Sequence, residues 1–388
     1  MPKNGNGTNL AFVTPAVIRW GLKRSGLSSE FVAGKLKVRP VELEAWAHAE
    51  GPYYPPFDKA QELAKLLHVP FGFLFLKQPP SADLPLPDFR GFNRDYKPSN
   101  ELFELLNDIL VKQDWYRDYV KEASKKPLPF VGSFKTSDSI FDVAADIRLR
   151  LKITQHLRQS VSSWSEYLAT LTRQTEEEGI LVMRSGVVAN ITKRKLKVSE
   201  LQGFALADPF APIVFVNSTD FKASQVFTIA HELAHIWLGV TALANADELG
   251  EVRDAVETVC NRVAAEVLVP KEEFLNAWRN DSGDAKVRIN RIARQFWVSG
   301  LVSLRRAREF GKISDEEFQK VKAHELGQRR RVTTSGGDYY RNVIARMSAR
   351  FTNAVIGDIN NGKLPLRDAA RLLGMKVPTL VRFAGMWK

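Results

Sequence analysis

The spacing of apolar residues predicts a chain built mostly from helices, with two short strands near its middle. Up to residue 178, apolar side chains mostly recur every three or four positions, which is typical of amphipathic helices. The runs Gly179–Met183 and Ala211–Val216 are consecutively apolar and contain β-branched residues, as buried strands do. Helical spacing then returns, so the pattern predicts an α+β core. The expected helices are Pro15–Arg24, Glu30–Leu36, Pro40–His48, Phe57–Leu67, Asn100–Ser124, Ser137–Leu151, Ser163–Glu178, Ala223–Leu238 and Glu251–Leu268.

Proline, aspartate and glycine mark the expected domain boundaries. The stretch Pro79–Pro98 is rich in Pro and Asp and predicts a linker, and Thr333–Gly337, with two adjacent glycines, predicts a hinge. Short helices before the linker suit an all-α helix-turn-helix bundle. The expected parts are an N-terminal helical domain at 1–80, a linker at 81–99, an α+β domain at 100–331 and a basic helical C-terminal extension at 338–388.

Composition narrows the class of protein. The 388 residues are 44% hydrophobic and 26% charged, as in ordinary soluble proteins of two or three domains. No apolar run approaches the ~18–20 residues of a membrane span, and the first ten residues do not resemble a secretory signal. A single cysteine, Cys260, excludes an intrachain disulfide framework. We therefore expect a cytoplasmic protein with no membrane partner.

Charge is distributed unevenly along the chain, whose net charge is +12. Residues 1–80 carry a net +4, residues 81–284 carry −6, residues 285–331 carry +8 and residues 339–388 carry +7. Such asymmetry predicts separate roles for separate parts, and a basic segment permits a polyanionic partner such as DNA.

The strongest chemical signal is an H-E-x-x-H motif within Phe227–His235. Histidines four residues apart lie on one helix face, so His231 and His235 can reach the same metal ion. Glu232 lies beside that face and can act as a general base on water. The flanking residues are apolar, and two histidines and a carboxylate in a buried helix require a strong partner. The motif therefore predicts a Zn²⁺ site.

A catalytic zinc site needs a third protein ligand, with water in the fourth position. Glu257 on the next helix is our choice, and Asn261, four residues later on the same face, can orient it by a hydrogen bond. Glu266 lies nine residues on, about half a turn away in azimuth, and cannot share that face. Cys260 is the weaker alternative, because a lone Cys in an apolar helix usually packs in the core.

These segments resemble the ImmA/IrrE family of zinc peptidases, gluzincin-like proteins often fused to Xre-type helix-turn-helix domains. The resemblance implies a zincin-like (gluzincin-type) fold for residues 100–331, with His231, His235 and Glu257 as zinc ligands and Glu232 as general base. It also implies hydrolysis of a regulatory protein, commonly a repressor encoded nearby. The matching segments are Gly203–Asp208, Pro212–Asn217, Phe227–His235 and Glu257–Pro270.

The first candidate helix-turn-helix, residues 14–67, resembles an Xre-type domain. Its recognition helix, Pro40–His48, carries two glutamates and no Lys or Arg, which opposes contact with phosphates. Lys35, Lys37 and Arg39 precede that helix and are the candidate DNA contacts. The alternative is a domain kept for protein contacts.

Two further segments have helix-turn-helix spacing. In Ile289–Phe310, a serine at 299 is expected to cap a helix whose exposed side carries Arg305, Arg306 and Arg308, candidate DNA contacts or simply a solvated face. The segment Leu366–Phe383 lies in the basic tail. It fits nucleic acid, an acidic partner protein or an amphipathic helix pair packed on the core.

The sequence thus favours a zinc-dependent endopeptidase that cleaves a repressor-like protein, with Glu232 activating water. The second hypothesis is an antitoxin-like transcriptional regulator that binds a partner toxin and operator DNA without proteolysis. A purely structural zinc site is the third, and it leaves Glu232 without a purpose.

Overall fold

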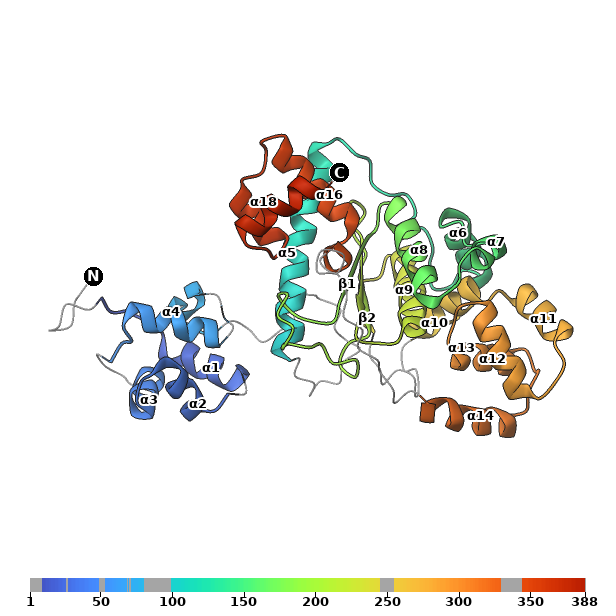
Figure 1. Ribbon diagram of the computed structural model, residues 1–388, viewed down its shortest axis with the longest axis horizontal. Coiled ribbons are helices and arrows are strands. Elements are labelled where there is room, and N and C mark those ends of the chain that lie inside the picture. Colours follow the sequence, from blue (N-terminus) through green and yellow to red (C-terminus); the bar gives the residue numbers. More distant parts are fainter. Residues whose placement is uncertain are drawn as a thin grey trace. The chain divides into compact units, whose positions relative to one another are not determined.

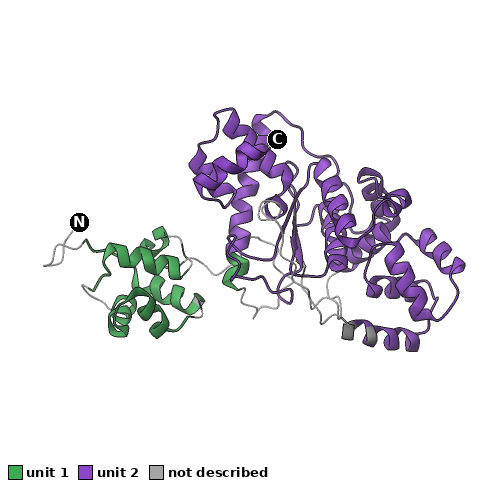
Figure 2. Cartoon of the chain, in the orientation of Figure 1, with its two compact units in different colours: residues 1–85, 97–103 green, residues 86–96, 104–388 purple. Residues whose placement is uncertain are grey.

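The computed structural model divides into two compact units, residues 1–85 with 97–103 and residues 86–96 with 104–388 (Figure 2). Each unit is described by itself. The predicted linker lies almost wholly outside the described residues, and the predicted hinge at 333–337 lies entirely outside them. The structure describes residues 9–25, 27–48, 53–67, 69, 71–79, 99–244, 255–328 and 344–387.

The described residues of unit 1 form helices, apart from an isolated antiparallel β-bridge between Leu10 and Pro56. Ser28 caps α2 by accepting a hydrogen bond from the Phe31 backbone N–H, and Lys37 ends that helix in the left-handed conformation. The inward faces of the helices form one apolar core that includes Ile18 and Leu43. A helical unit is what the sequence predicts, and its assignment to the Xre type stays a prediction. The elements are α1 (Pro15–Ser25), α2 (Ser29–Leu36), α3 (Pro40–His48), α4 (Phe57–Leu66) and the 3₁₀ helix η1 (Phe71–Phe75).

Unit 2 is built on a four-stranded mixed sheet with the order β1-β3-β2-β4 (Figure 1). β1 pairs with β3 in parallel, while β2 is antiparallel to both β3 and β4. The sequence predicted β1 and β3 and missed β2 and β4, which have only four and three residues. The strands are β1 (Leu181–Ser185), β2 (Gly203–Leu206), β3 (Ile213–Asn217) and β4 (Ala242–Ala244).

Both faces of the central strands are covered, since every residue of β2 and β3 is buried. Side chains alternate between the faces of a strand. Val214 and Val216 join the core that also contains the apolar residues of α9, whereas Phe204 and Phe215 stack with ring centroids 5.0 Å apart. Helices α8 and α9 lie on one side of the sheet and α5 lies on the other (Figure 1).

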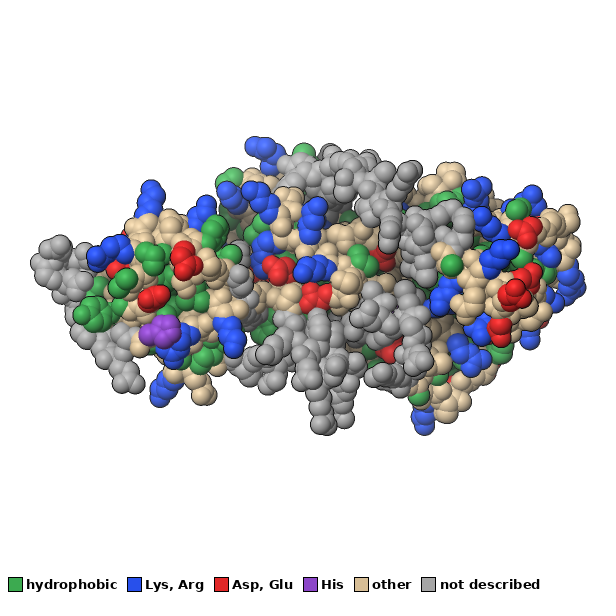
Figure 3. Space-filling view, turned by 90° about the horizontal axis from the view of Figure 1, so that it is seen from below, with side chains coloured by type: hydrophobic (Ala, Val, Ile, Leu, Met, Phe, Trp, Pro, Cys, Tyr) green, Lys and Arg blue, Asp and Glu red, His purple; other side chains and the backbone are tan. Residues whose placement is uncertain are grey.

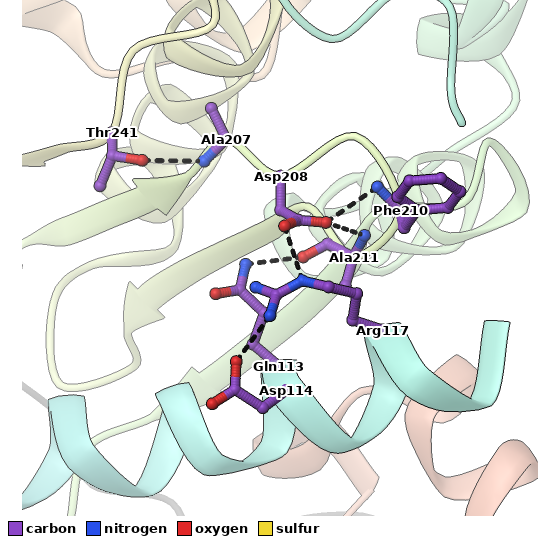
Figure 4. A network of polar contacts seen from close by, with 8 residues as sticks. All are labelled: Gln113, Asp114, Arg117, Ala207, Asp208, Phe210, Ala211 and Thr241. Atoms are coloured by element: carbon purple, nitrogen blue, oxygen red, sulfur yellow. Dashed lines mark hydrogen bonds and ion pairs between the residues drawn. The ribbon is translucent and has the colours of Figure 1, made fainter. Parts of the chain in front are cut away.

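The turn between β2 and β3 is fixed to α5 by a polar network (Figure 4). Asp208 accepts hydrogen bonds of 2.8 Å from the backbone N–H groups of Phe210 and Ala211. Arg117 of α5 donates to the same carboxylate at 2.8 Å, and Gln113 donates to the Ala211 carbonyl at 2.8 Å. This network stabilises the end of β2, the strand that lies against α9.

The remaining helices of unit 2 surround this core. The C-terminal helices are anchored to α5 and α8, because Arg350 donates to the Tyr116 hydroxyl and to the Glu176 carbonyl at 2.8 and 2.9 Å. None of the described helices is both long and apolar enough to cross a membrane. The helices are α5 (Asn100–Glu122), α6 (Ile140–Arg150), α7 (Gln155–Gln159), α8 (Trp164–Glu177), α9 (Lys222–Leu238), α10 (Ala255–Leu268), α11 (Lys271–Asn280), α12 (Ala285–Gln295), α13 (Gly300–Glu309), α14 (Asp315–Gln328), α16 (Ala349–Asn360), α17 (Leu366–Leu372) and α18 (Val377–Met386).

Candidate metal centre

The H-E-x-x-H motif lies on α9, a helix that is buried along most of its length. Gly239 ends the helix at φ +68°, and a Cβ there would lie 2.9 Å from the Cα of Gly132. Glycine is therefore required at this position both for its backbone conformation and for the close approach of the neighbouring loop. His231 and His235, one turn apart, are 4% and 0% exposed.

Glu257 of α10 reaches the two histidines from the neighbouring helix. Its carboxylate oxygens lie 3.0 Å from Nε2 of His231 and 3.2 Å from Nε2 of His235. The two Nε2 atoms are 3.1 Å apart. The structure thus brings together the three residues that the sequence singled out as ligands, and they form a group that could hold a metal ion.

The spacing of these atoms fits one shared cation. Tetrahedral ligands at ~2.0–2.1 Å from zinc lie about 3.3 Å from one another. The separations observed between the donor atoms are 3.0 to 3.2 Å, close to that value. Two imidazole nitrogens and one carboxylate also match the donor set of a catalytic zinc site with an open fourth position.

The protonation of Glu257 suits a metal ligand. Burial raises the pKa of its carboxyl, but hydrogen bonds and charge interactions with His231 and His235 lower it by more. The net result is a pKa well below the ordinary value of a glutamate, so the side chain is a carboxylate at neutral pH.

Glu232 is fully buried next to His231, where α9 crosses β2. A Cβ added to Gly203 of β2 would lie 3.0 Å from Oε1 of Glu232 and 2.4 Å from Cγ2 of Thr228. The strand therefore runs directly past the candidate general base, and only glycine permits this distance. Gly203 is not among the site residues predicted from the sequence, although a glycine that begins a short apolar run is a signal of close backbone approach.

The other residues considered for the site lie elsewhere. Asn261 is one turn after Glu257 and lines a neighbouring cavity, so its orienting role stays a prediction. Cys260 is buried in the apolar core and is not part of the metal-binding group. Glu266 points away from the metal group, as predicted from its azimuth, and its carboxylate forms a buried ion pair with Arg306.

The sequence predicts that Arg306 is exposed, and this prediction is wrong. This side chain is 2% exposed and donates two hydrogen bonds to the Val269 carbonyl, at 2.8 and 3.0 Å. It also pairs with Glu309 at 2.7 Å. Burial against α10 leaves Arg306 inaccessible to a DNA phosphate, because its donors are used within the protein.

The remaining candidate DNA contacts are accessible to different degrees. Arg308 is exposed and pairs with Asp315 at 2.7 Å, whereas Arg305 is half-buried. Figure 3 shows Lys and Arg side chains of unit 2 interspersed with Asp and Glu on the face drawn there. In unit 1, three basic side chains are exposed near the turn between α2 and α3, and DNA contact by them stays a prediction. They are Lys35, Lys37 and Arg39, the last paired with Glu42 at 3.4 Å.

Comparison with known proteins finds two family models. Residues 175–308 match an IrrE N-terminal-like domain (Peptidase_M78), and residues 347–386 match a domain of unknown function (DUF8813). No curated protein matches the chain. The first match spans the sheet, α9 and α10, so it includes the whole candidate metal centre and supports a metallopeptidase of the ImmA/IrrE type.

Proposed function

We propose that this chain is a cytoplasmic, zinc-dependent endopeptidase that cleaves a repressor-like regulatory protein, with unit 1 as an Xre-type domain. The observation that supports this most is the convergence of His231, His235 and Glu257 within 4.8 Å, with Glu232 buried beside them. A match of this segment to a peptidase family supports the same reading. A structural metal site would have no use for a buried glutamate at position 232.

The chemistry follows from the positions of these side chains. His231, His235 and Glu257 would hold the zinc ion, which would supply a Lewis acid for the scissile carbonyl and for the attacking water. The carboxylate of Glu232 accepts a proton from the attacking water and returns it to the leaving amine.

The test is co-expression of the chain with the protein encoded beside its gene, followed by intact mass spectrometry of that neighbour. Wild type should yield two fragments of the neighbour, whereas Glu232→Gln should leave it whole. The matched control is Glu272→Gln, an exposed glutamate of α11 that should cleave as wild type does. Fragments of equal yield with wild type and Glu232→Gln would contradict the proposal.

The second candidate is an antitoxin-like regulator, favoured by the exposed basic side chains of the C-terminal helices. Arg371 and Arg382 are exposed on α17 and α18, in a part of the chain that carries a net +7. Deleting residues 339–388 would not test this idea cleanly, because Phe351 of α16 is buried against Tyr116 and Trp115. The sharper variant is Arg371→Glu with Arg382→Glu. If the regulator candidate is right, the neighbour co-purifies uncleaved with the wild type and no longer co-purifies with this variant. If the peptidase proposal is right, the variant still cleaves the neighbour into fragments.

A further inference from the structure

Helices α17 and α18 form a helix-turn-helix that lies in the part of unit 2 beside α5, away from α9 and α10 (Figure 1). The turn between them passes through Gly374 at φ +59° and joins helices of seven and ten residues. Asn190 donates to the Gly374 carbonyl at 3.0 Å, so the turn is fixed to the rest of unit 2. Two short helices joined by a glycine turn are the arrangement in which many DNA-binding proteins present a recognition helix.

The two helices pack through their apolar sides, and α17 contacts both α16 and α18. Ala370 of α17 is 5% exposed, and Leu380 and Phe383 of α18 are 0% and 2% exposed. Trp387 donates from Nε1 to the side-chain carbonyl of Asn353 at 2.7 Å, which joins the end of α18 to α16. These contacts use one side of α18 and leave the other side exposed.

The exposed side of α18 has the shape and chemistry of a helix that enters a DNA groove. A stripe of four exposed residues runs along it at the spacing i, i+3, i+4 and i+7, formed by Pro378, Val381, Arg382 and Gly385. Arg382 is the long side chain among them, so the helix backbone can approach base edges closely. An arginine matches the acceptors of guanine, and an apolar side chain such as Val381, which is 52% exposed, matches the methyl group of thymine.

The exposed charge around this stripe is almost entirely positive. Within residues 361–387, five basic side chains are exposed and one acidic side chain, Asp368, is exposed. None of the five basic groups forms an ion pair with another residue that the structure describes, so their charge is available to a partner. Contacts with phosphates supply most of the affinity of a protein for DNA. The five are Lys363, Arg367, Arg371, Lys376 and Arg382.

The helix-turn-helix candidate of unit 1 has the opposite charge on its second helix. Helix α3 carries Glu42 and Glu44 and no Lys or Arg, whereas α18 carries Arg382 and no Asp or Glu. A recognition helix lies between two rows of phosphates, which repel carboxylates. The C-terminal pair therefore suits DNA better than the N-terminal pair does.

We propose that α17 and α18 bind double-stranded DNA, with α18 in the major groove. Arg367 and Lys376, at the starts of the two helices, contact phosphates, and Val381 and Arg382 read base edges. The positive charge alone would also suit an acidic protein, but the glycine turn and the small residues on the outer side of α18 favour DNA. This activity is separate from the peptidase function, because it uses none of the residues of the candidate metal centre.

The first test measures binding of the full-length protein to a fluorescein-labelled duplex of random sequence, about 20 base pairs long, by fluorescence anisotropy at several salt concentrations. Arg367→Gln with Lys376→Gln should weaken binding about tenfold or more at ~0.1 M salt. It should also reduce the slope of log affinity against log salt by about 1.8, since each phosphate contact contributes ~0.9. The matched control is Arg173→Gln with Arg279→Gln, which removes two exposed arginines from α8 and α11 and should bind as wild type does.

The second test separates reading of bases from contact with phosphates. Wild type and variants select duplexes from a pool with a randomised centre, and the bound fraction is sequenced. Wild type should enrich a short motif, and Arg382→Gln should lose about tenfold of the discrimination at one guanine of that motif. Arg367→Gln with Lys376→Gln should select the same motif with weaker binding.

Each outcome supports or overturns DNA binding by this pair of helices. A wild type that does not bind the duplex contradicts it, as does a salt slope that is equal for wild type and Arg367→Gln with Lys376→Gln. Displacement of the duplex by polyglutamate of equal total charge, as effectively as by unlabelled duplex, would show a surface for acidic proteins instead. A motif that Arg382→Gln selects unchanged would refute α18 as the recognition helix.

Discussion

Replacing Arg306 with Met removes the cation that joins α10 to α13. In the structure its guanidinium donates to the Val269 carbonyl twice, pairs with Glu309 and forms a buried ion pair with Glu266. Glu266 is 8% exposed, and the other hydrogen bond that its carboxylate accepts comes from the Lys271 backbone N–H at 3.0 Å. A buried charge that has lost its counter-ion is costly.

The expected cost follows from the burial of the pair. Breaking a buried ion pair by removing one partner destabilises a protein by ~3–5 kcal/mol. In a domain of this size each kcal/mol lowers the melting temperature by ~2–4 °C, so Arg306→Met should melt roughly 6–20 °C below wild type. The matched change is Arg308→Met, whose pair with Asp315 joins side chains 48% and 79% exposed, and it should cost at most ~1 kcal/mol.

Urea unfolding followed by tryptophan fluorescence measures both variants, since Trp278 and Trp297 report on the same core. The double variant Glu266→Gln with Arg306→Met should recover more than ~1 kcal/mol relative to Arg306→Met alone, because no unpaired charge then remains buried. If Arg306→Met and Arg308→Met unfold at the same urea concentration, Arg306 is not buried. The exposure that the sequence predicts for Arg306 would then be correct.

Three further predictions concern metal, pH and backbone packing. Glu257→Gln should bind less than one tenth of the zinc that wild type holds after dialysis, measured by plasma mass spectrometry, and equal zinc content would exclude Glu257 as a ligand. Burial raises the pKa of Tyr167 to about 12, so stability is intact below pH 10 and falls by roughly 2–3 kcal/mol between pH 10 and 12, as the unfolded chain loses a proton that the folded chain keeps. Tyr167→Phe should flatten this decline in urea unfolding; an unchanged slope would show that Tyr167 does not cause it. Gly203→Ala places a Cβ 2.4 Å from Thr228 and 2.8 Å from the Phe215 carbonyl, so it should lower the free energy of unfolding by ~1–3 kcal/mol, and a variant as stable as wild type would refute the close packing of β2 on α9.

Much of the helical framework was predictable because apolar spacing is a local property. The predicted α3 has the same bounds in the structure, and α1, α2, α4 and α9 differ by one residue at one end. The third candidate ligand could also be predicted from spacing, since Glu257 and Asn261 lie four residues apart on one helix. The two short strands were not, because β2 begins with glycine and is defined by its pairing with β3 rather than by its own pattern.

The wrong prediction that Arg306 is exposed also arises because the tertiary fold, and not the local sequence, determines its surroundings. Three arginines on one short helix look like a solvated face, and the sequence gives no direct sign that the middle one faces another helix. Glu266 was the available clue, because an acidic residue in the apolar helix α10 needs a cation nearby. Its partner lies 40 residues further along the chain, and only the tertiary fold places it there.

The central claim is that His231, His235 and Glu257 hold a zinc ion beside the general base Glu232. The most direct test measures zinc content and cleavage on the same samples. Cleavage of the co-expressed neighbour is read by intact mass spectrometry. Glu232→Gln should retain one zinc per chain and lose cleavage, whereas Glu257→Gln should lose both. Cleavage by Glu232→Gln at the wild-type rate, or by a wild-type protein freed of metal, would contradict the proposed centre.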